Sequence, residues 1–492
     1  MARPTPQDDP ISRRLRAERG NVFRQGGARV AMLYPSPYRV GMSSLGFQWI
    51  LENLRRDGFS AERAFHPDDD APPMRGGLVT YETRTPLSAF RVIGISLAYE
   101  LELAGLIRSL ELAGIPPLRR DRGAWHPRII LGGPLTFSNP LPAAPFVDAM
   151  LLGESEDHVS EVMGSALDDD RQTFLDRVQA TPGGFVPERD GTRLPEVARA
   201  SDARLPAVGP ILAPEAELTD MFLIEGERGC HRQCTFCVMR RSTNGGMRLV
   251  TPDRVLGLIP DEARRVGLVG AAISDHPGLV GLIENLVESG RGVGVSSLRA
   301  DRVARKPELA RLLRKGGYKT LTVASDAASQ RLRRTLAKGT NEANLLQCAE
   351  MAREHAYRQV KVYMMVGVPD ETDEDLDELI EFTRRMAAIH PVALGIAPFV
   401  PKRNTPLDGV PFAGIKLVER RLGRLKRGLR GAAEVRPTSA RWAWVESELA
   451  MGGTEAGEAV LHAVHAGGRF AAWRSALKAV DPETARPWAT SP

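Results

Sequence analysis

The sequence predicts an α/β fold in which two series of buried parallel strands alternate with helices, followed by a helical region. Short, continuously apolar runs recur between helix-like stretches, as expected for strands that are covered on both faces. The chain has 492 residues, of which 42% are hydrophobic and 26% are charged. It is therefore long enough for several domains and too apolar to be disordered.

Changes in pattern along the chain divide it into five parts. These are a polar tail (1–27), a first strand–helix series (28–165), a Pro- and Gly-rich linker (166–220), a second series (221–412) and a helical region (413–492). The divisions lie where apolar runs give way to turn-forming residues or to helical spacing.

The first series contains four runs with the character of buried strands. They are ARVAMLYP from Ala28, FRVIGISLA from Phe90, RIILGGP from Arg128 and VDAMLLGE from Val147. Ligands of parallel sheets bind outside the carboxyl ends of the strands. Gly133, at the end of the third run, and Thr136, just after it, are therefore candidates for ligand contact, the alternative being that Gly133 and Pro134 form only a tight turn.

The second series contains six such runs with helical stretches between them. They are MFLIEGE from Met221, VGLVGAAIS from Val266, GVGVSSL from Gly292, YKTLTVAS from Tyr318, QVKVYMMVGVP from Gln359 and VALGIAPFV from Val392. Six strand–helix units predict a parallel barrel or part of one, with its site at the carboxyl ends of the strands.

Several classes of protein are excluded by composition. No run approaches the length of about 18 apolar residues that a membrane helix needs, and the first residues lack the apolar segment of a secretory signal. The chain has four cysteines, too few for a disulfide framework, so we expect a cytoplasmic protein. The net charge is +5, but the basic clusters have no interleaved aromatic residues, so nucleic-acid binding is not indicated.

Three of the four cysteines, Cys230, Cys234 and Cys237, follow the first strand of the second series on a glycine-flanked loop. A zinc site is one interpretation, but structural zinc sites usually use a second cysteine pair, and His231 is poorly placed beside Cys230. Soft thiolates also suit an iron–sulfur cluster. Three thiolates would leave one iron of a cubane without a protein ligand, open to a substrate or cofactor.

The spacing Cys230-x₃-Cys234-x₂-Cys237, with Phe236 before the last cysteine, resembles the cluster motif of the radical S-adenosylmethionine (radical SAM) superfamily. The resemblance implies a 4Fe–4S cluster held by these cysteines, with S-adenosylmethionine on the open iron and Phe236 near that cofactor. It further implies cleavage of S-adenosylmethionine to a 5′-deoxyadenosyl radical, and an external electron donor of the flavodoxin or ferredoxin type.

The resemblance extends along the chain to a branch with an N-terminal cobalamin-binding-like domain. The segments that carry it are LYPSPYRVGMSSLGFQ, LGGPLTFSNP, SSLRAD, VASDAASQRLRR, VYMMVGVPDETDED and PFVPKRNTP. It implies a Rossmann-like cobalamin-binding-type domain, a partial (β/α)₆ TIM-like barrel and a C-terminal helical region. It also implies cofactor contacts at Ser297, Asp326 and Ser329, and cobalamin contacts at Gly133 and Thr136.

The sequence departs from this branch at two places. Asp326 stands where the branch usually has Glu, and Ala328 stands where it has Gly, so the cofactor contacts there differ. The first series has no Asp-x-His-x-x-Gly motif and therefore offers no histidine as a lower ligand to cobalt. No cysteine precedes Cys230, which excludes the second cluster of methylthiotransferases.

Polar residues after the barrel strands are further candidates for the site. Asp275 follows the second strand and with His276 forms either an acid–base pair or a helix-capping turn. Arg299 follows the third strand, placed to bind a carboxylate or hydroxyls. Lys361 and Tyr363 are two residues apart on one strand, so they share a face and are predicted to point inward, away from the helices.

We therefore expect a radical SAM enzyme, with cobalamin-assisted methylation of an unactivated carbon as the favoured reaction. The alternative keeps the radical for oxidation, cyclisation or rearrangement without methyl transfer from cobalamin. A non-catalytic iron–sulfur or zinc protein is the alternative from another class. The sequence does not identify the substrate, because specificity depends on loops whose sequence does not reveal what they bind.

Overall fold

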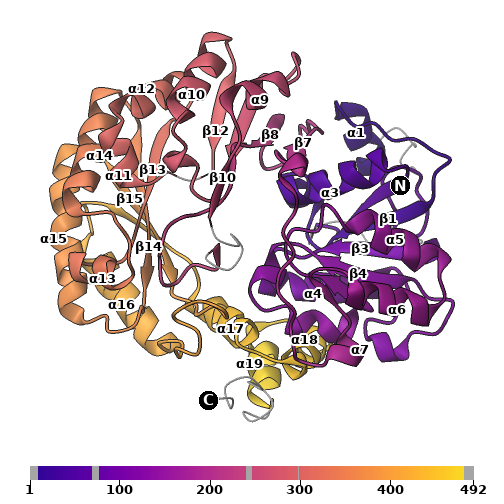
Figure 1. Ribbon diagram of the computed structural model, residues 1–492. Coiled ribbons are helices and arrows are strands. Elements are labelled where there is room, and N and C mark those ends of the chain that lie inside the picture. Colours follow the sequence, from indigo (N-terminus) through magenta and orange to yellow (C-terminus); the bar gives the residue numbers. More distant parts are fainter. Residues whose placement is uncertain (1–8, 69–76, 240–245, 297, 481–492) are drawn as a thin grey trace, which may run out of the picture. The chain divides into compact units, whose positions relative to one another are not determined.

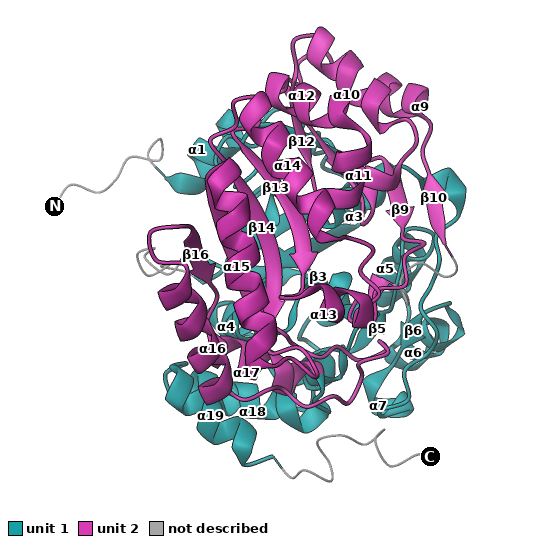
Figure 2. Cartoon of the chain, turned by 90° about the vertical axis from the view of Figure 1, so that its left-hand side faces the viewer, with its two compact units in different colours: residues 1–223, 451–492 teal, residues 224–450 magenta. Residues whose placement is uncertain are grey.

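The computed structural model describes residues 9–68, 77–239, 246–296 and 298–480. The chain forms two compact units (Figure 2). Unit 1 comprises residues 1–223 and 451–492, and unit 2 comprises residues 224–450. The α/β class with parallel sheets predicted from the sequence is confirmed in both units.

Unit 1 is built on a six-stranded sheet of order β2-β1-β3-β4-β5-β6, in which only β6 runs antiparallel to its neighbour. Its strands are β1 (Arg29–Tyr34), β2 (Ser60–Phe65), β3 (Val92–Ser96), β4 (Arg128–Gly132), β5 (Ala149–Leu151) and β6 (Gly184–Phe185). β2 lies on one side of β1, and β3 and the later strands lie on the other side, so the strand order reverses direction after β2. The carboxyl ends of β1 and β3 therefore form the switch point at which sheets of this order bind ligands.

Helices cover both faces of this sheet because the crossovers are right-handed. Figure 1 shows α3 and α4 on opposite faces. The helices of unit 1 are α1 (Pro10–Ala17), α2 (Tyr38–Gly41), α3 (Leu45–Arg56), α4 (Leu103–Leu112), α5 (Val159–Asp168), α6 (Arg171–Ala180), α7 (Pro187–Asp190), α18 (Thr454–His465) and α19 (Phe470–Lys478).

Residues expected to be a tail and a linker are built into unit 1. The described part of the tail includes α1, whose Ile11 is buried in the core. Within 166–220 the chain forms α6, β6, α7 and the short β7 (Val208–Gly209). Buried side chains such as Phe174 and Phe185 explain why this segment is ordered despite its Pro and Gly content.

The strand β2 was not predicted, because two of its six side chains are charged. Arg63 is fully buried between Glu18 and Glu82, donating to Glu18 Oε1 at 2.7 Å and to Glu82 Oε1 at 2.7 Å. Glu62 is also buried, and its Oε1 accepts from Arg29 Nη2 at 2.7 Å. These partners are distant in sequence, so the pairing cannot be recognised from the strand alone.

Unit 2 is a half-open barrel of parallel strands. One sheet has the order β12-β11-β8 and the other the order β13-β14-β15-β16, and a parallel bridge between Arg299 and Ala324 links them. The strands are β8 (Met221–Glu225), β11 (Arg265–Val269), β12 (Gly292–Val295), β13 (Thr320–Asp326), β14 (Gln359–Val366), β15 (Val392–Pro398) and β16 (Glu434–Pro437). The six predicted strands are confirmed, and β16 is a seventh in a region expected to be only helical.

Helices lie on the outer side of these strands (Figure 1). They are α9 (Pro252–Gly257), α10 (Leu279–Glu288), α11 (Ala300–Arg305), α12 (Pro307–Lys315), α13 (Gln330–Thr335), α14 (Glu342–Glu354), α15 (Asp373–Ile389), α16 (Ile415–Gly428) and α17 (Ala440–Ala450). The predicted C-terminal region is thus shared, since α16 and α17 belong to unit 2 and α18 and α19 to unit 1.

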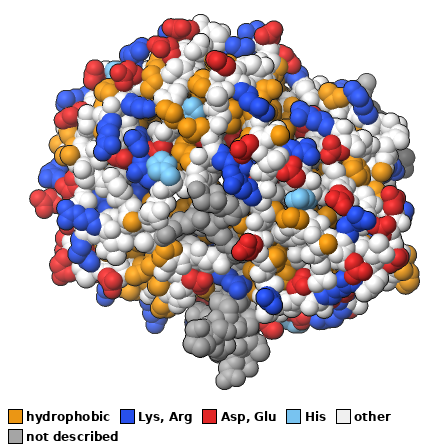
Figure 3. Space-filling view, viewed as in Figure 1, with side chains coloured by type: hydrophobic (Ala, Val, Ile, Leu, Met, Phe, Trp, Pro, Cys, Tyr) orange, Lys and Arg blue, Asp and Glu red, His pale blue; other side chains and the backbone are white. Residues whose placement is uncertain are grey.

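No helix among the described residues is long and apolar enough to span a membrane. On the face shown in Figure 3, Lys and Arg side chains are interspersed with Asp and Glu.

Replacement of Arg63 by Met is expected to destabilise unit 1 strongly. Removing the guanidinium leaves Glu18 buried without its ion-pair partner and Glu82 with Arg55 alone, and breaking a buried pair typically costs about 3–5 kcal/mol. The measurement is the free energy of unfolding from urea titration. Arg56→Met is the control, because the Arg56–Glu52 pair is exposed and contributes little. Equal effects of the two substitutions would contradict the importance of the buried network.

Candidate functional site

The cysteine loop, residues 230–237, follows the short strand β9 (Glu227–Gly229) at the carboxyl edge of the barrel strands. β9 continues from β8 after a single residue and pairs antiparallel with β10 (Met247–Leu249). Gly229 has φ of +93°, a left-handed conformation that glycine adopts readily. This residue lets the chain turn out of the strand directly before Cys230.

The three thiols of the loop are free, and none forms a disulfide. Cys234 is buried, whereas Cys230 and Cys237 are half-buried. Burial raises the pKa of Cys230 and of Cys237, and the charge of Cys234 raises the pKa of both further. The backbone N–H of Arg232 donates to Cys230 Sγ at 3.4 Å. The thiols are therefore close enough to interact electrostatically.

The thiols of Cys230, Cys234 and Cys237 suit a cluster of several metal ions. Three cysteine thiols lie on one short loop, and each thiolate of an iron–sulfur cluster binds its own iron, so the sulfurs need not meet at one point. Among residues 9–68, 77–239, 246–296 and 298–480, no group of three or more His, Cys, Asp or Glu side chains is arranged to hold a single metal ion.

One side of the cysteine loop is fixed by the segment after α13. The N–H of Thr235 donates to the carbonyl of Leu336 at 3.1 Å, and the thiol of Cys234 lies 3.8 Å from the carbonyl oxygen of Ala337. Ala337 has φ of +52°, an unusual conformation for alanine that aims its carbonyl at the loop. Backbone groups thus determine the position of Cys234.

The other side of the loop is fixed by Asp275, in the short helix η7 (Ile273–Asp275) after β11. Its carboxylate is fully buried and accepts two hydrogen bonds from the guanidinium of Arg232, at 2.8 and 2.9 Å. Arg302 of α11 also pairs with it. Although burial alone would raise the pKa of Asp275, the hydrogen bonds and charge of Arg232, the hydrogen bond of Arg302 and the charge of Arg299 lower it to about 2.

This geometry favours a positioning role for Asp275 over the predicted acid–base role. A carboxylate that two arginines hold ionised is a poor proton donor or acceptor near neutral pH. His276, the predicted partner, is buried, with Nε2 2.9 Å from the carbonyl of Val250 and Nδ1 accepting from the N–H of Gly278. Both nitrogens are occupied by the backbone, so His276 forms the turn that the sequence offered as the alternative.

Arg299 lies at the end of the third barrel strand, as predicted. The residue is only 8% exposed, and its Nη2 is 3.0 Å from Asp301 Oδ1. Neither Nε nor Nη2 makes a hydrogen bond with any described residue. A buried guanidinium with unused donors is suited to a carboxylate or hydroxyl group of a ligand.

The predicted cofactor contacts in the fourth-strand region have different environments. Asp326 has φ of +62° at a bulge at the end of β13 and pairs with Lys338. Ser329 is fully buried, caps α13 by accepting from the N–H of Leu332, and donates to Asp375 Oδ1 at 2.5 Å. Ser329 is therefore a structural residue. Phe236 is half-buried on the cysteine loop, and Ser297 lies outside the described residues.

Glu227, three residues before Cys230, was not predicted from the sequence. The side chain is fully buried, Oε1 accepts from the N–H of Ala272 at 2.6 Å, and Oε2 has no hydrogen-bond partner among the described residues. Burial raises the pKa of Glu227 to about 7. A glutamate in a strand next to a cysteine motif gives no signal in the sequence, because its burial depends on how η7 packs over it.

In unit 1, Gly133 and Thr136 are used by the protein's own packing. A Cβ on Gly133, which has φ of +102°, would lie 2.7 Å from the carbonyl oxygen of Leu97. The Thr136 hydroxyl is buried, donates to the carbonyl of Gly133 at 2.7 Å and accepts from the N–H of Gly153 at 3.1 Å. Thr136 is therefore unavailable to a ligand, whereas Gly133 is partly exposed at the turn.

The switch point of unit 1 holds a carboxylate of the chain itself. Glu102, in the short helix η2 (Glu100–Glu102), accepts from the hydroxyl of Ser36 at 2.9 Å and from the N–H of Ala98 at 2.7 Å. These donors follow β1 and β3 respectively. Glu102 is buried, and burial raises its pKa. The residues present at this edge therefore do not form a recognisable cobalamin site.

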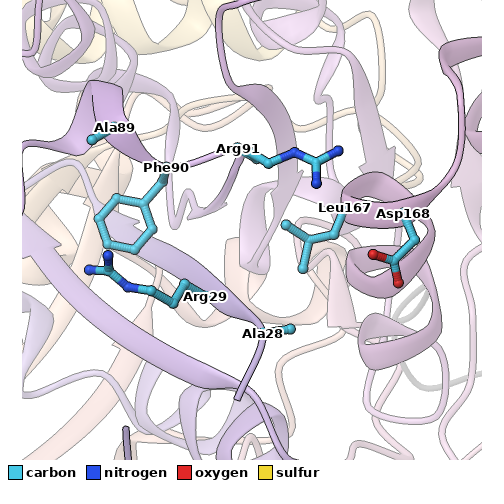
Figure 4. A pocket seen from close by; sticks show the side chains of 7 residues that line it. All are labelled: Ala28, Arg29, Ala89, Phe90, Arg91, Leu167 and Asp168. Carbon is cyan, nitrogen blue, oxygen red and sulfur yellow. The ribbon is translucent and has the colours of Figure 1, made fainter. Parts of the chain in front are cut away.

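A cavity of about 300 Å³ lies at the opposite edge of the unit 1 sheet, at the amino ends of β1 and β3 (Figure 4). The guanidinium of Arg29 stacks on the ring of Phe90 at 4.8 Å, and Arg91 and Asp168 also line the cavity. This position is away from the carboxyl ends where sheets of this kind bind ligands.

Two parts of the chain match known families. Residues 46–187 match the family described as "Radical SAM proteins, N-terminal", and residues 224–383 match the family described as "Radical SAM superfamily". The second match begins six residues before Cys230 and contains the whole cysteine loop.

The chain is 28% identical over 415 residues to the uncharacterized protein MJ0966 of Methanocaldococcus jannaschii, covering 82% of this chain and 84% of that protein. Among solved structures it resembles the cobalamin-dependent S-adenosylmethionine radical enzyme OxsB with aqua-cobalamin bound, at 13% identity and a TM-score of 0.51. The apo form of OxsB gives 12% identity and the same TM-score. The alignment covers 82% of this chain but 56% of OxsB, so it supports the fold alone.

Replacement of Asp275 by Asn is expected to lower the free energy of unfolding by about 2–3 kcal/mol at pH 7, because it leaves the charges of Arg232 and Arg302 unpaired. The folded-state pKa of about 2 lies below the ordinary value near 3.9. The contribution is therefore complete above about pH 4 and is lost as the pH falls towards 2. Urea titrations at pH 7 and pH 3 should show a smaller difference between the two proteins at pH 3. A difference independent of pH would contradict an ionised, paired Asp275.

Proposed function

We propose that this radical SAM enzyme binds a 4Fe–4S cluster through Cys230, Cys234 and Cys237 and uses it to cleave S-adenosylmethionine. The observation that carries the proposal is the fixed loop with three free thiols at the carboxyl edge of the barrel. The superfamily implies both cofactors. Three protein thiolates leave one iron of the cluster for S-adenosylmethionine.

The residues around the loop have separate tasks in this proposal. Asp275 holds Arg232, and the carbonyls of Leu336 and Ala337 hold the backbone and thiol of the loop, so the sulfurs keep their spacing. The unused N–H groups of Arg299 are the best placed donors for an anionic or hydroxyl group of the cofactor. Arg299 is therefore a binding residue in our proposal.

When bound, the cluster and S-adenosylmethionine together supply a 5′-deoxyadenosyl radical after one-electron reduction. The electron comes from an external donor, as radical SAM enzymes generally require. Protein of the flavodoxin or ferredoxin type suits this task. The partly buried loop limits access of water to the place where the radical forms.

The reaction that follows is hydrogen abstraction from a substrate carbon. Methylation of that carbon with the help of cobalamin is the first candidate outcome, and the cobalamin dependence named for OxsB, whose fold is similar, supports the cobalamin part alone. The buried, hydrogen-bonded side chains of Thr136 and Glu102 favour the second candidate, which is oxidation, cyclisation or rearrangement without cobalamin. We derive no step through cobalamin, because the residues expected to hold it do not fit.

Replacement of Cys234 by Ala is expected to abolish both cluster binding and cleavage of S-adenosylmethionine. Anaerobically reconstituted protein should contain about four irons per chain, and the variant should lose them because two thiolates do not retain a cubane. Cys348→Ala is the matched control, since Cys348 is fully buried in the core beneath α11 and makes no contact with the loop. Iron retained equally in both variants would contradict the cluster assignment.

The products of S-adenosylmethionine distinguish the two candidate reactions. Radical chemistry alone should yield 5′-deoxyadenosine, whereas methyl transfer should also yield S-adenosylhomocysteine. We expect 5′-deoxyadenosine without S-adenosylhomocysteine, and no cobalamin retained after gel filtration with hydroxocobalamin. Liquid chromatography and the visible spectrum measure these outcomes. Stoichiometric retention together with S-adenosylhomocysteine would establish methylation instead.

A further inference from the structure

The inner face of the β13–β14–β15 sheet is the side of the barrel that the helices of unit 2 leave uncovered. Along β14, Val360, Val362 and Met364 are buried, while the intervening side chains are more exposed. β13 alternates in the same way. The helices α14 and α15 lie on the other side of these strands (Figure 1). The prediction that Lys361 and Tyr363 share the inward face agrees with this pattern.

Lys361 and Tyr363 form a polar pair on this face. Lys361 Nζ donates to the hydroxyl oxygen of Tyr363 at 2.9 Å and lies 4.5 Å from the centre of its ring. Tyr363 is 48% exposed although it sits on an inner strand of the sheet. The ring of Tyr363 is therefore open to contact with a ligand.

The residues beside Tyr363 on the neighbouring strands are small. In register, Tyr363 lies between Ala324 of β13 and Gly395 of β15. A Cβ on Gly395 would come within 2.9 Å of the Tyr363 ring, so a larger residue would displace the ring. Thr322 lies beside Lys361 and adds a hydroxyl. The result is a surface on which the polar groups of Lys361, Tyr363 and Thr322 lie beside small residues.

The charge of Lys361 is not balanced. Among the described residues no carboxylate lies within ion-pair distance of it, and its one hydrogen bond goes to a neutral phenol. Asp326, at the end of β13, is already paired with Lys338. An ammonium group and a phenol O–H on an apolar surface together recognise negatively charged oxygens.

We propose that Lys361 and Tyr363 bind the anionic group, a carboxylate or phosphate, of the substrate. Naming this as the substrate's group rests on the proposed function, because the barrel interior lies next to the edge where the radical would form. Tyr363 is three residues before the end of β14, about 10 Å below the carboxyl edge at 3.3 Å per residue. The pair is thus separate from the cysteine loop and from the cofactor site there.

The test uses the cluster-loaded protein labelled with 3-fluorotyrosine. The chain has seven tyrosines, and the ¹⁹F resonance of Tyr363 is identified by its loss in Tyr363→Phe. Inorganic phosphate and acetate are titrated separately. We expect at least one anion to shift the Tyr363 resonance saturably while that of Tyr99, an exposed tyrosine of unit 1, stays in place. The more effective anion indicates whether the substrate carries a phosphate or a carboxylate.

Lys361→Met is expected to weaken this binding at least tenfold, whereas Lys361→Arg retains most of it. Lys315→Met, at an exposed position on α12, is the control for a general loss of positive charge. The other tyrosine resonances report whether each variant is folded. A shift that does not saturate, or one of equal affinity in Lys361→Met, would overturn the proposal.

A second arm separates this site from that of the cofactor. Saturating S-adenosylmethionine should leave the anion-dependent shift in place, and displacement would overturn the assignment to substrate. The titration needs no turnover. A protein that shows the shift but cleaves no S-adenosylmethionine would refute the proposed function and leave the anion site standing. Normal cleavage without the shift would refute only the anion site.

Discussion

The cysteine loop has no regular secondary structure, so its geometry depends on the ion pairs and backbone contacts that hold it from two sides. Asp275 fixes Arg232 between the first two cysteines, and the carbonyls of Leu336 and Ala337 fix the part around Cys234. Burying the Asp275 carboxylate costs free energy, and its pairing with the guanidinium groups of Arg232 and Arg302 offsets that cost. Thiols on a free loop would lose considerable entropy on binding a cluster, whereas this loop is ordered beforehand.

The barrel strands were predicted well because each is a continuous apolar run. Such a run can be recognised in the sequence without knowing which strands pair with it. The inward position of Lys361 and Tyr363 could also be predicted, because the alternation of side chains along a strand depends only on local sequence. Strand β2 was missed for the opposite reason. Arg63 and Glu62 look like surface residues until the distant Glu18, Glu82 and Arg29 neutralise them.

The candidate site was predicted only in part, because residue type and position do not reveal which partner a side chain has already taken. The three cysteines form one loop as expected. Ser329 donates to Asp375, 46 residues later, and Thr136 binds two backbone groups, so neither is available. Arg299 remains available because its buried Nε makes no hydrogen bond with a described residue. Such differences arise from tertiary packing.

The distribution of unused polar groups separates two functions within unit 2. Around the cysteine loop, most polar groups are paired with the protein, and the exceptions, on Glu227, Thr235 and Arg299, are buried atoms. Deeper in the barrel, the unpaired charge of Lys361 lies on an accessible surface of small and apolar residues. A rigid edge suits a cofactor that is the same in every turnover, whereas an open, charged interior suits selection of a substrate. In our proposal, the specificity of the enzyme therefore depends on β13, β14 and β15 more than on the cysteine loop.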